Sequence, residues 1–236
     1  MPRLRPRAVV FDADDTLWLT MPLYRKAILK FSRLMADHGF NPATAVSTLD
    51  HIDRANVASM GFTRRRFQVS MLATYAVLRP PASRASRTLQ AQIRTVAGEV
   101  FETKAPVVKN AAKVLRSLKA SFSLILLTKG EKSVQRKRLD ESGLAKYFDA
   151  IRIVPGKTPM TFRDLRHLGV QPKVSWCVGD SLRSDIIPAS RAGFEVIWIT
   201  HRNWGYEMAP IPPKIKVRVC TNLEQVHRII LQGQTQ

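Results

Sequence analysis

Val9-Val10-Phe11-Asp12-Ala13-Asp14-Asp15-Thr16-Leu17 is the stretch that decides the fold. It joins a short apolar run, which begins at Ala8, to a group of carboxylates. A short apolar run with a polar boundary is typical of a buried strand. In open α/β sheets, ligands bind where the strands end. The carboxylates that close this strand are therefore the first candidates for a functional site.

Further apolar runs alternate with helix-like segments after Pro106. This alternation predicts a Rossmann-like α/β fold, in which a parallel sheet is covered by helices on both faces. The predicted strands are 8–11, 122–128, 150–154, 174–178, 196–199 and 217–219, and the predicted helices are 107–119, 132–142, 160–168, 184–192 and 223–231.

The stretch between the first strand and Pro106 has a different character. Apolar residues recur at helical spacing around 23–35, 67–78 and 89–101, and no strand pattern stands out. We therefore expect an inserted all-helical cap subdomain at 18–105. The α/β core domain would consist of 1–17 and 106–236.

The composition excludes several classes of protein. Of the 236 residues, 45% are hydrophobic, which is enough for a packed core. No apolar run reaches the roughly 18 residues of a membrane span, and the one near the N-terminus is too short for a secretory signal, so we expect a cytoplasmic protein with no membrane partner. Cys177 and Cys220 are not in CxxC spacing, which argues against a zinc site or a disulfide framework.

The net charge of +20, from 38 Lys and Arg against 18 Asp and Glu, is unusual. Such a field attracts anionic substrates. The basic residues are scattered, and no aromatic-basic stacking pattern accompanies them. A nucleic-acid partner is therefore possible but not favoured, and the oligomeric state leaves no signal in the sequence.

Polar residues close several predicted strands. The first strand ends in Asp12 and Asp14, the next in Thr128, and a later one in Asp180, with Asp185 five residues further on. Two carboxylates about 4 Å apart repel each other by roughly 4 kcal/mol at an effective dielectric near 20. A divalent cation removes that conflict. Oxygen ligands without His or Cys favour Mg²⁺ over zinc.

These landmarks resemble the four motifs of the haloacid dehalogenase (HAD) superfamily, and they occur in the same order between about 7 and 200. The matching residues are Asp12, Asp14 and Thr16 for DxDxT, Thr128 for the strand-end hydroxyl, Lys157 for the cation, and Gly179, Asp180 and Asp185 for the GDxxxxD-type pair.

The resemblance implies the catalytic roles. Asp12 would attack phosphorus and form a phosphoaspartate. Asp14 would protonate the leaving oxygen and then deprotonate the hydrolytic water. Thr128 and Lys157 would hold the phosphoryl oxygens. Lys129 also follows a core strand and remains the alternative to Lys157, although many relatives carry Asn at its position.

The resemblance also implies Mg²⁺ as the cofactor. Its ligands would be Asp12, Asp180 and the backbone carbonyl of Asp14, with Asp185 ligating directly or supporting the others. Asp14 favours phosphate esters, because HAD dehalogenases carry an aromatic residue there and phosphonatases carry Ala. Phosphomutases share this Asp, so transfer to a second hydroxyl stays open. Asp15, where many relatives carry Gly, is interpreted as structural.

The helical insertion would be a cap that closes over the site and selects the substrate. Arg54, Arg64, Arg65 and Arg66 are candidates for binding an anion there, although a solvated basic face is the favoured interpretation of each. We expect an Mg²⁺-dependent phosphatase acting on a small phosphorylated metabolite. The alternatives are a phosphatase of nucleic-acid ends and a non-catalytic phosphate-binding protein. The last is disfavoured because Asp12 and Asp14 are both retained.

Overall fold

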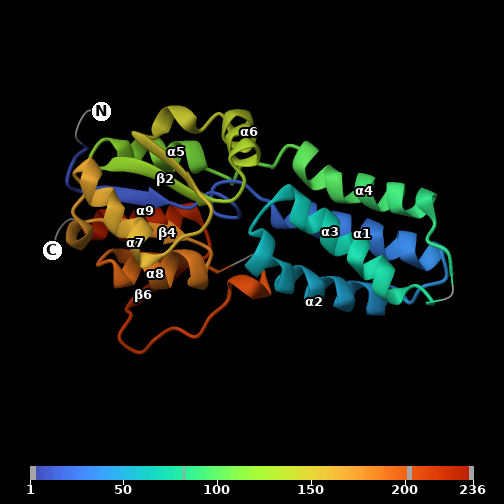
Figure 1. Cartoon of the computed structure of the whole chain (residues 1–236). Coiled ribbons are helices and arrows are strands. Elements are labelled where there is room, and N and C mark those ends of the chain that lie inside the picture. The colour runs from blue at the N-terminus through green and yellow to red at the C-terminus, as the bar shows by residue number, and fades with distance from the viewer. Residues whose placement is uncertain (1–3, 82, 201–203, 234–236) are drawn as a thin grey trace. The chain divides into compact units, whose positions relative to one another are not determined.

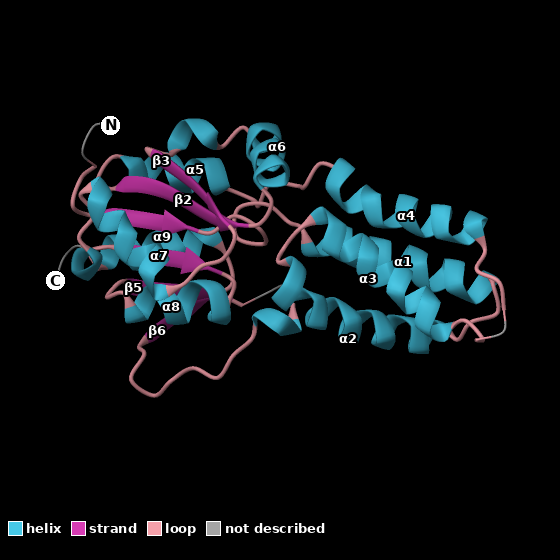
Figure 2. Ribbon diagram, viewed as in Figure 1, coloured by secondary structure: helices cyan, strands magenta, loops and turns pink. Residues whose placement is uncertain are grey.

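The chain divides into two compact units in a computed structural model that describes residues 4–81, 83–200 and 204–233. One unit consists of Met1–Leu19 with Ala105–Gln236, and the other of Thr20–Lys104. The first contains a sheet flanked by helices, whereas the second is helical (Figures 1 and 2). No helix in the described ranges is long and apolar enough to span a membrane.

The described part of the first unit contains a six-stranded parallel sheet with the order β3-β2-β1-β4-β5-β6. The strand order reverses direction about β1, so the carboxyl ends of β1 and β4 meet where α/β sheets bind ligands. The strands are β1 (Ala8–Phe11), β2 (Ser123–Lys129), β3 (Ala150–Val154), β4 (Trp176–Gly179), β5 (Glu195–Ile199) and β6 (Val217–Cys220).

Register aligns the ends of the central strands. Phe11 of β1 pairs with Leu126 of β2 on one side and with Val178 of β4 on the other. Asp12, one residue beyond Phe11, therefore leaves the sheet beside the end of β4, where its backbone N–H donates to the Val178 carbonyl at 2.9 Å.

Helices cover this sheet (Figure 2). α7 packs against α8 and α5 against α9, and α7 and α8 contribute apolar side chains to one buried cluster with the sheet. The α-helices are α5 (Ala111–Lys119), α6 (Lys132–Ser142), α7 (Pro159–Arg163), α8 (Ile187–Arg191) and α9 (Leu223–Gln232); the short turns are η1 (Ala145–Tyr147), η2 (Asp164–Leu168), η3 (Pro172–Val174), the π-helical η4 (Leu182–Ile186) and η5 (Gly205–Glu207).

The predicted fold class is confirmed, and three helix boundaries need correction. The helix predicted at 107–119 begins only at Ala111, because Asn110 takes a left-handed conformation (φ 62°) and Val107 pairs with Trp18. The helix predicted at 160–168 becomes a 3₁₀ turn after Arg163. The helix predicted at 184–192 is a π-helical turn followed by the short α8.

The helical unit contains α1 (Met21–Asp37), α2 (Pro42–Met60), α3 (Arg64–Leu78) and α4 (Arg87–Glu102). Its interior includes an edge-to-face pair between Tyr24 and Phe67. The apolar spacing of the sequence does not predict α2. This helix has a local start signal, because the Asn41 side chain accepts from Thr44 N at 2.9 Å, but Asp53 interrupts its apolar face. Asp53 is buried because it pairs with Arg66 of α3.

Candidate active site

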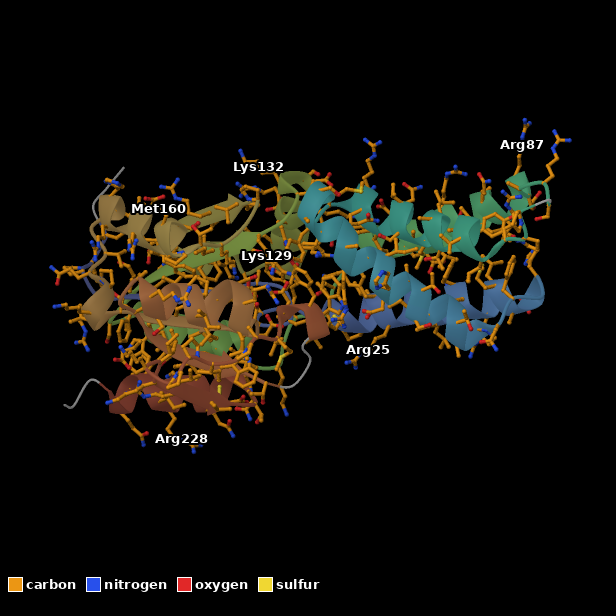
Figure 3. The ribbon with its side chains drawn as sticks, turned by 60° about the horizontal axis from the view of Figure 1, so that its bottom comes forward. Arg25, Arg87, Lys129, Lys132, Met160 and Arg228 are labelled. Carbon is orange, nitrogen blue, oxygen red and sulfur yellow. The ribbon has the colours of Figure 1, made fainter. Side chains whose placement is uncertain are left out.

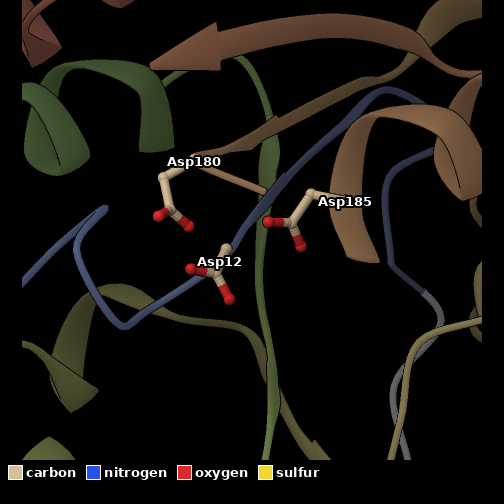
Figure 4. A group of neighbouring side chains, drawn as sticks. All are labelled: Asp12, Asp180 and Asp185. Carbon is tan, nitrogen blue, oxygen red and sulfur yellow. The ribbon is translucent and has the colours of Figure 1, made fainter. Parts of the chain in front are cut away.

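Three carboxylates converge at the ends of β1 and β4 (Figure 4). Asp12 follows β1 directly, Asp180 follows β4 directly, and Asp185 lies in η4. Each offers one oxygen, and these oxygens lie within 4.8 Å of one another. The structure thus brings together three residues that the sequence predicts as metal ligands.

Asp185 reaches this position because of two local features. Asp185 N and Ile186 N both donate to the Ser181 carbonyl, at 3.0 and 3.1 Å, which widens the turn into a π-helix. At Gly179, an added Cβ would lie 2.4 Å from Asp185 Oδ2, so glycine alone leaves room for this carboxylate. Ser181 N then donates to the same oxygen at 3.1 Å.

Lys157 lies among these carboxylates. Its Nζ donates to Asp12 Oδ1 at 2.5 Å and to Asp185 Oδ1 at 2.6 Å, and its side chain is 1% exposed. Burial by itself would lower the pKa of Lys157, but the two carboxylates outweigh burial and raise the pKa above its ordinary value. The lysine is therefore a fixed cation at the nucleophile candidate.

One lysine does not balance three acids. Burial raises the pKa of Asp12 to about 7, Lys157 opposes this rise, and the charge of Asp185 adds to it. Burial, followed by repulsion from Asp12 and Asp185, raises the pKa of Asp180 well above its ordinary value. A divalent cation would relieve this excess of negative charge, and the carboxylate donor set fits Mg²⁺.

Asp14 lies in the loop after β1 and is held by three side chains. Trp18 Nε1 donates to Oδ1 at 2.7 Å, Gln135 Nε2 donates to Oδ2 at 2.8 Å, and Arg138 Nη1 lies 3.2 Å from both oxygens. Gln135 and Arg138 belong to none of the predicted motifs. Their positions could have indicated that they are buried, because they share one face of α6 with the apolar residues Val134 and Leu139.

The remaining predicted residues lie at the same ends of the strands. Thr128 is the penultimate residue of β2 and is 2% exposed. Asp15 has φ 59°, a left-handed conformation that favours glycine. Its N–H donates to the Trp18 carbonyl at 2.6 Å, which agrees with a structural role.

Lys129, the alternative phosphate-binding lysine, belongs to a second buried network. Its Nζ lies 2.6 Å from both Glu207 Oε1 and Ser184 Oγ, and the hydroxyls of Ser181 and Ser184 donate to the other Glu207 oxygen. In Figure 3, Lys129 lies among the elements of its unit, whereas the exposed Lys132 projects outward. Glu207 had no signal in the sequence, because it lies far from any motif.

Glu207 should stabilise the fold in a pH-dependent manner. Burial alone would raise its pKa, but the Lys129 ammonium and hydrogen bonds from Lys129, Ser181 and Ser184 lower it below the usual 4.5. This stabilisation is therefore present above pH 4.5 and is lost as the pH falls through the lower, folded value. Glu207→Gln should reduce the free energy of unfolding by about 3 kcal/mol at neutral pH, measured by urea denaturation.

The matched control is Glu195→Gln, which removes an exposed ion pair with Arg218. We expect it to cost less than about 1 kcal/mol. The loss of unfolding free energy caused by Glu207→Gln should become smaller at acidic pH. Equal losses for the two variants, or a Glu207→Gln deficit that does not change with pH, would contradict a stabilising Lys129–Glu207 pair.

The arginines proposed for the cap are mostly engaged within the helical unit. Arg66 is 3% exposed, whereas Arg65 is exposed. Three of the four form ion pairs there: Arg54 with Asp50, Arg64 with Glu102, and Arg66 with Asp53. Their pairing weakens these three as anion-binding candidates.

Comparison with known proteins identifies a family and several relatives that agree with the geometry of the site. The model of the haloacid dehalogenase-like hydrolase family matches residues 6–193. The N-acylneuraminate-9-phosphatase of Homo sapiens is 26% identical over 207 residues, which cover 83% of each chain. The rat enzyme of the same name is 26% identical over 209 residues, again with 83% of each chain covered.

Solved structures share the fold. A haloacid dehalogenase-like family hydrolase from Xanthomonas campestris superposes with a TM-score of 0.77 at 21% identity, over 100% of both chains. The HAD hydrolase YfnB from Bacillus subtilis, solved with bound magnesium, has a TM-score of 0.62 at 22% identity, over 96% of this chain and 99% of its own. The motif order, the parallel sheet and the family match agree, and this chain belongs to the haloacid dehalogenase-like hydrolases.

Proposed function

We propose that the protein is an Mg²⁺-dependent phosphatase that hydrolyses a small phosphorylated metabolite through a phosphoaspartate intermediate. The observation that carries the proposal is the convergence of Asp12, Asp180 and Asp185 around the buried Lys157. This arrangement supplies a nucleophile, a cation for the phosphoryl group and a site for a divalent metal within one small volume.

The reaction would proceed in two displacements. A carboxylate oxygen of Asp12 attacks phosphorus, the bond from phosphorus to the ester oxygen breaks, and Asp14 gives that oxygen a proton. Asp14 then takes a proton from water as the water attacks the phosphoaspartate. Inorganic phosphate leaves and Asp12 is regenerated. An alkoxide needs a proton on leaving, so Asp at position 14 favours phosphate esters over halides.

The other residues would stabilise charge. Lys157 and Thr128 hold the oxygens of the transferring phosphoryl group. Asp12, Asp180, Asp185 and the backbone carbonyl of Asp14 would hold Mg²⁺, which when bound neutralises charge on the phosphoryl oxygens. Because the metal ligands and Lys157 share Asp12 and Asp185, the same cluster would bind both the metal and the substrate phosphate.

The substrate class is a small phosphorylated molecule. The human and rat relatives are named for N-acylneuraminate 9-phosphate, a phosphorylated sugar acid, and they match this chain along most of its length. Phosphorylated sugars and sugar acids are therefore the first compounds to test. The charge of +20 would speed the encounter with any of them.

A panel of phosphorylated metabolites tests the proposal. With Mg²⁺, at least one member should release inorganic phosphate, and chelation of the metal should reduce the rate by roughly 100-fold or more. Release of phosphate from no member would contradict the proposal, and a phosphorylated acceptor in place of free phosphate would indicate a mutase. Faster turnover of a terminally phosphorylated oligonucleotide than of a mononucleotide would favour the nucleic-acid alternative.

A further inference from the structure

Helix α6 buries two polar side chains where a helix on a sheet normally buries apolar ones. Its buried residues are Val134, Gln135, Arg138 and Leu139. Gln135 is 3% exposed and Arg138 is 6% exposed. Removing a guanidinium from water costs several kcal/mol unless a carboxylate compensates it. The burial of these two side chains therefore calls for a partner, and departures from local packing rules cluster at functional sites.

The partner is the Asp14 carboxylate. Arg138 Nη1 lies 3.2 Å from each of its oxygens, Gln135 Nε2 lies 2.8 Å from Oδ2, and Trp18 Nε1 lies 2.7 Å from Oδ1. Both oxygens thus accept from fixed donors. Gln135 Nε2 also donates to the backbone carbonyl of Lys129 at 2.9 Å, which ties this arrangement to the end of β2.

The donors are buried, whereas the acceptor is accessible. Trp18 is 0% exposed, and its backbone forms β-bridges with Asp14 and Val107. These bridges fix the backbone position from which the indole side chain extends. The Asp14 side chain remains 33% exposed. A reactive group that is held by packed neighbours while it remains open to a ligand is pre-organised for proton transfer.

We infer that Arg138, Gln135 and Trp18 are positioning residues that orient the Asp14 carboxyl group, which in its protonated form gives a proton to the leaving oxygen and in its ionised form takes one from water. This inference rests on the proposed function, in which Asp14 is the acid and base. These residues act through Asp14. Their removal should therefore matter most when the leaving oxygen needs a proton, and least when the leaving group departs readily as an anion.

The test compares two aryl phosphates of similar shape. Phenolate is a poor leaving group and para-nitrophenolate a good one, so general-acid catalysis assists phenyl phosphate more. In the first turnover with Mg²⁺, Arg138→Met should slow the release of phenol roughly 10- to 100-fold and that of para-nitrophenolate less than about threefold. Gln135→Met and Trp18→Phe, which remove one donor each, should shift the ratio in the same direction. Arg138→Lys should restore part of the loss.

The control is Arg136→Met, which makes the same change at an exposed position of α6 and should alter neither rate. In an Asp14→Asn background, Arg138→Met should have no further effect on phenol release. Thermal unfolding identifies folded variants; if Arg138→Met fails to fold, Gln135→Met and Arg138→Lys carry the same comparison. Equal losses on both substrates in a folded variant would overturn the inference alone. An Asp14→Asn variant that keeps full phenol release would instead contradict the acid and base role of Asp14 in the proposed function, so the two failures are distinguishable.

Discussion

Asp12→Asn is expected to reduce Mg²⁺-dependent phosphate release by roughly 10⁴-fold or more. An amide is a poor nucleophile at phosphorus, and the change also removes one of the three converging carboxylates. The measurement is steady-state phosphate release on the best substrate of the panel. Intact mass spectrometry of the quenched wild-type enzyme should show a phosphorylated protein, and the variant should show none.

Asp140→Asn is the matched control, because it makes the same chemical change at an exposed position. It should retain full activity. If Asp12→Asn kept more than roughly a hundredth of the wild-type rate, the nucleophile would have to be another residue. The phosphoaspartate mechanism would then be wrong, even if the phosphatase activity itself remained.

Lys157→Met should produce the second large effect. The loss of a fixed cation beside the transferring phosphoryl group should lower kcat by roughly 10²- to 10³-fold. The same change leaves Asp12 and Asp185 without their buried ammonium, so the free energy of unfolding without metal should fall by about 3–5 kcal/mol. Urea denaturation with and without Mg²⁺, together with kcat on the best substrate, measures both effects.

Lys129→Met provides the comparison that separates the two lysines. The Lys129 ammonium is held by Glu207 and Ser184, so we expect this change to lower kcat less than about 10-fold. If Lys129→Met abolished activity and Lys157→Met did not, Lys129 would be the phosphate-binding lysine and our preference for Lys157 would be wrong.

The sequence predicted the fold well where local pattern and tertiary environment agree. The strand at 8–11 was predicted with its observed bounds, because four apolar residues are followed at once by carboxylates. α2 could not be predicted from apolar spacing, because the buried Asp53 interrupts its apolar face. The burial of Asp53 depends on its ion pair with Arg66 of another helix. The start of α5 was wrong because the left-handed Asn110 delays it, and a single residue's conformation leaves no periodic signal.

The residues of the candidate site likewise divide into those that the sequence predicts and those that it does not. Asp12, Asp180, Asp185 and Lys157 belong to motifs, and the structure places them together. The residues that hold the site's other side chains belong to no motif, and their partners are distant in sequence. Arg138 contacts Asp14 across 124 positions, and Glu207 contacts Lys129 across 78. Such pairs can be identified only in the folded structure, because in the sequence each of these charged residues predicts an ordinary exposed position.

The π-helical turn that carries Asp185 makes the carboxylate cluster sensitive to chain length as well as to residue identity. Each residue of an α-helix rotates the next by about 100°. Deleting one residue between Asp180 and Asp185 would let the turn close as an α-helix and swing the carboxylate away from Asp12. Surface loops usually vary in length between homologues more readily than the elements they connect. This segment should behave in the opposite manner, accepting substitutions at the exposed Arg183 but no insertion or deletion.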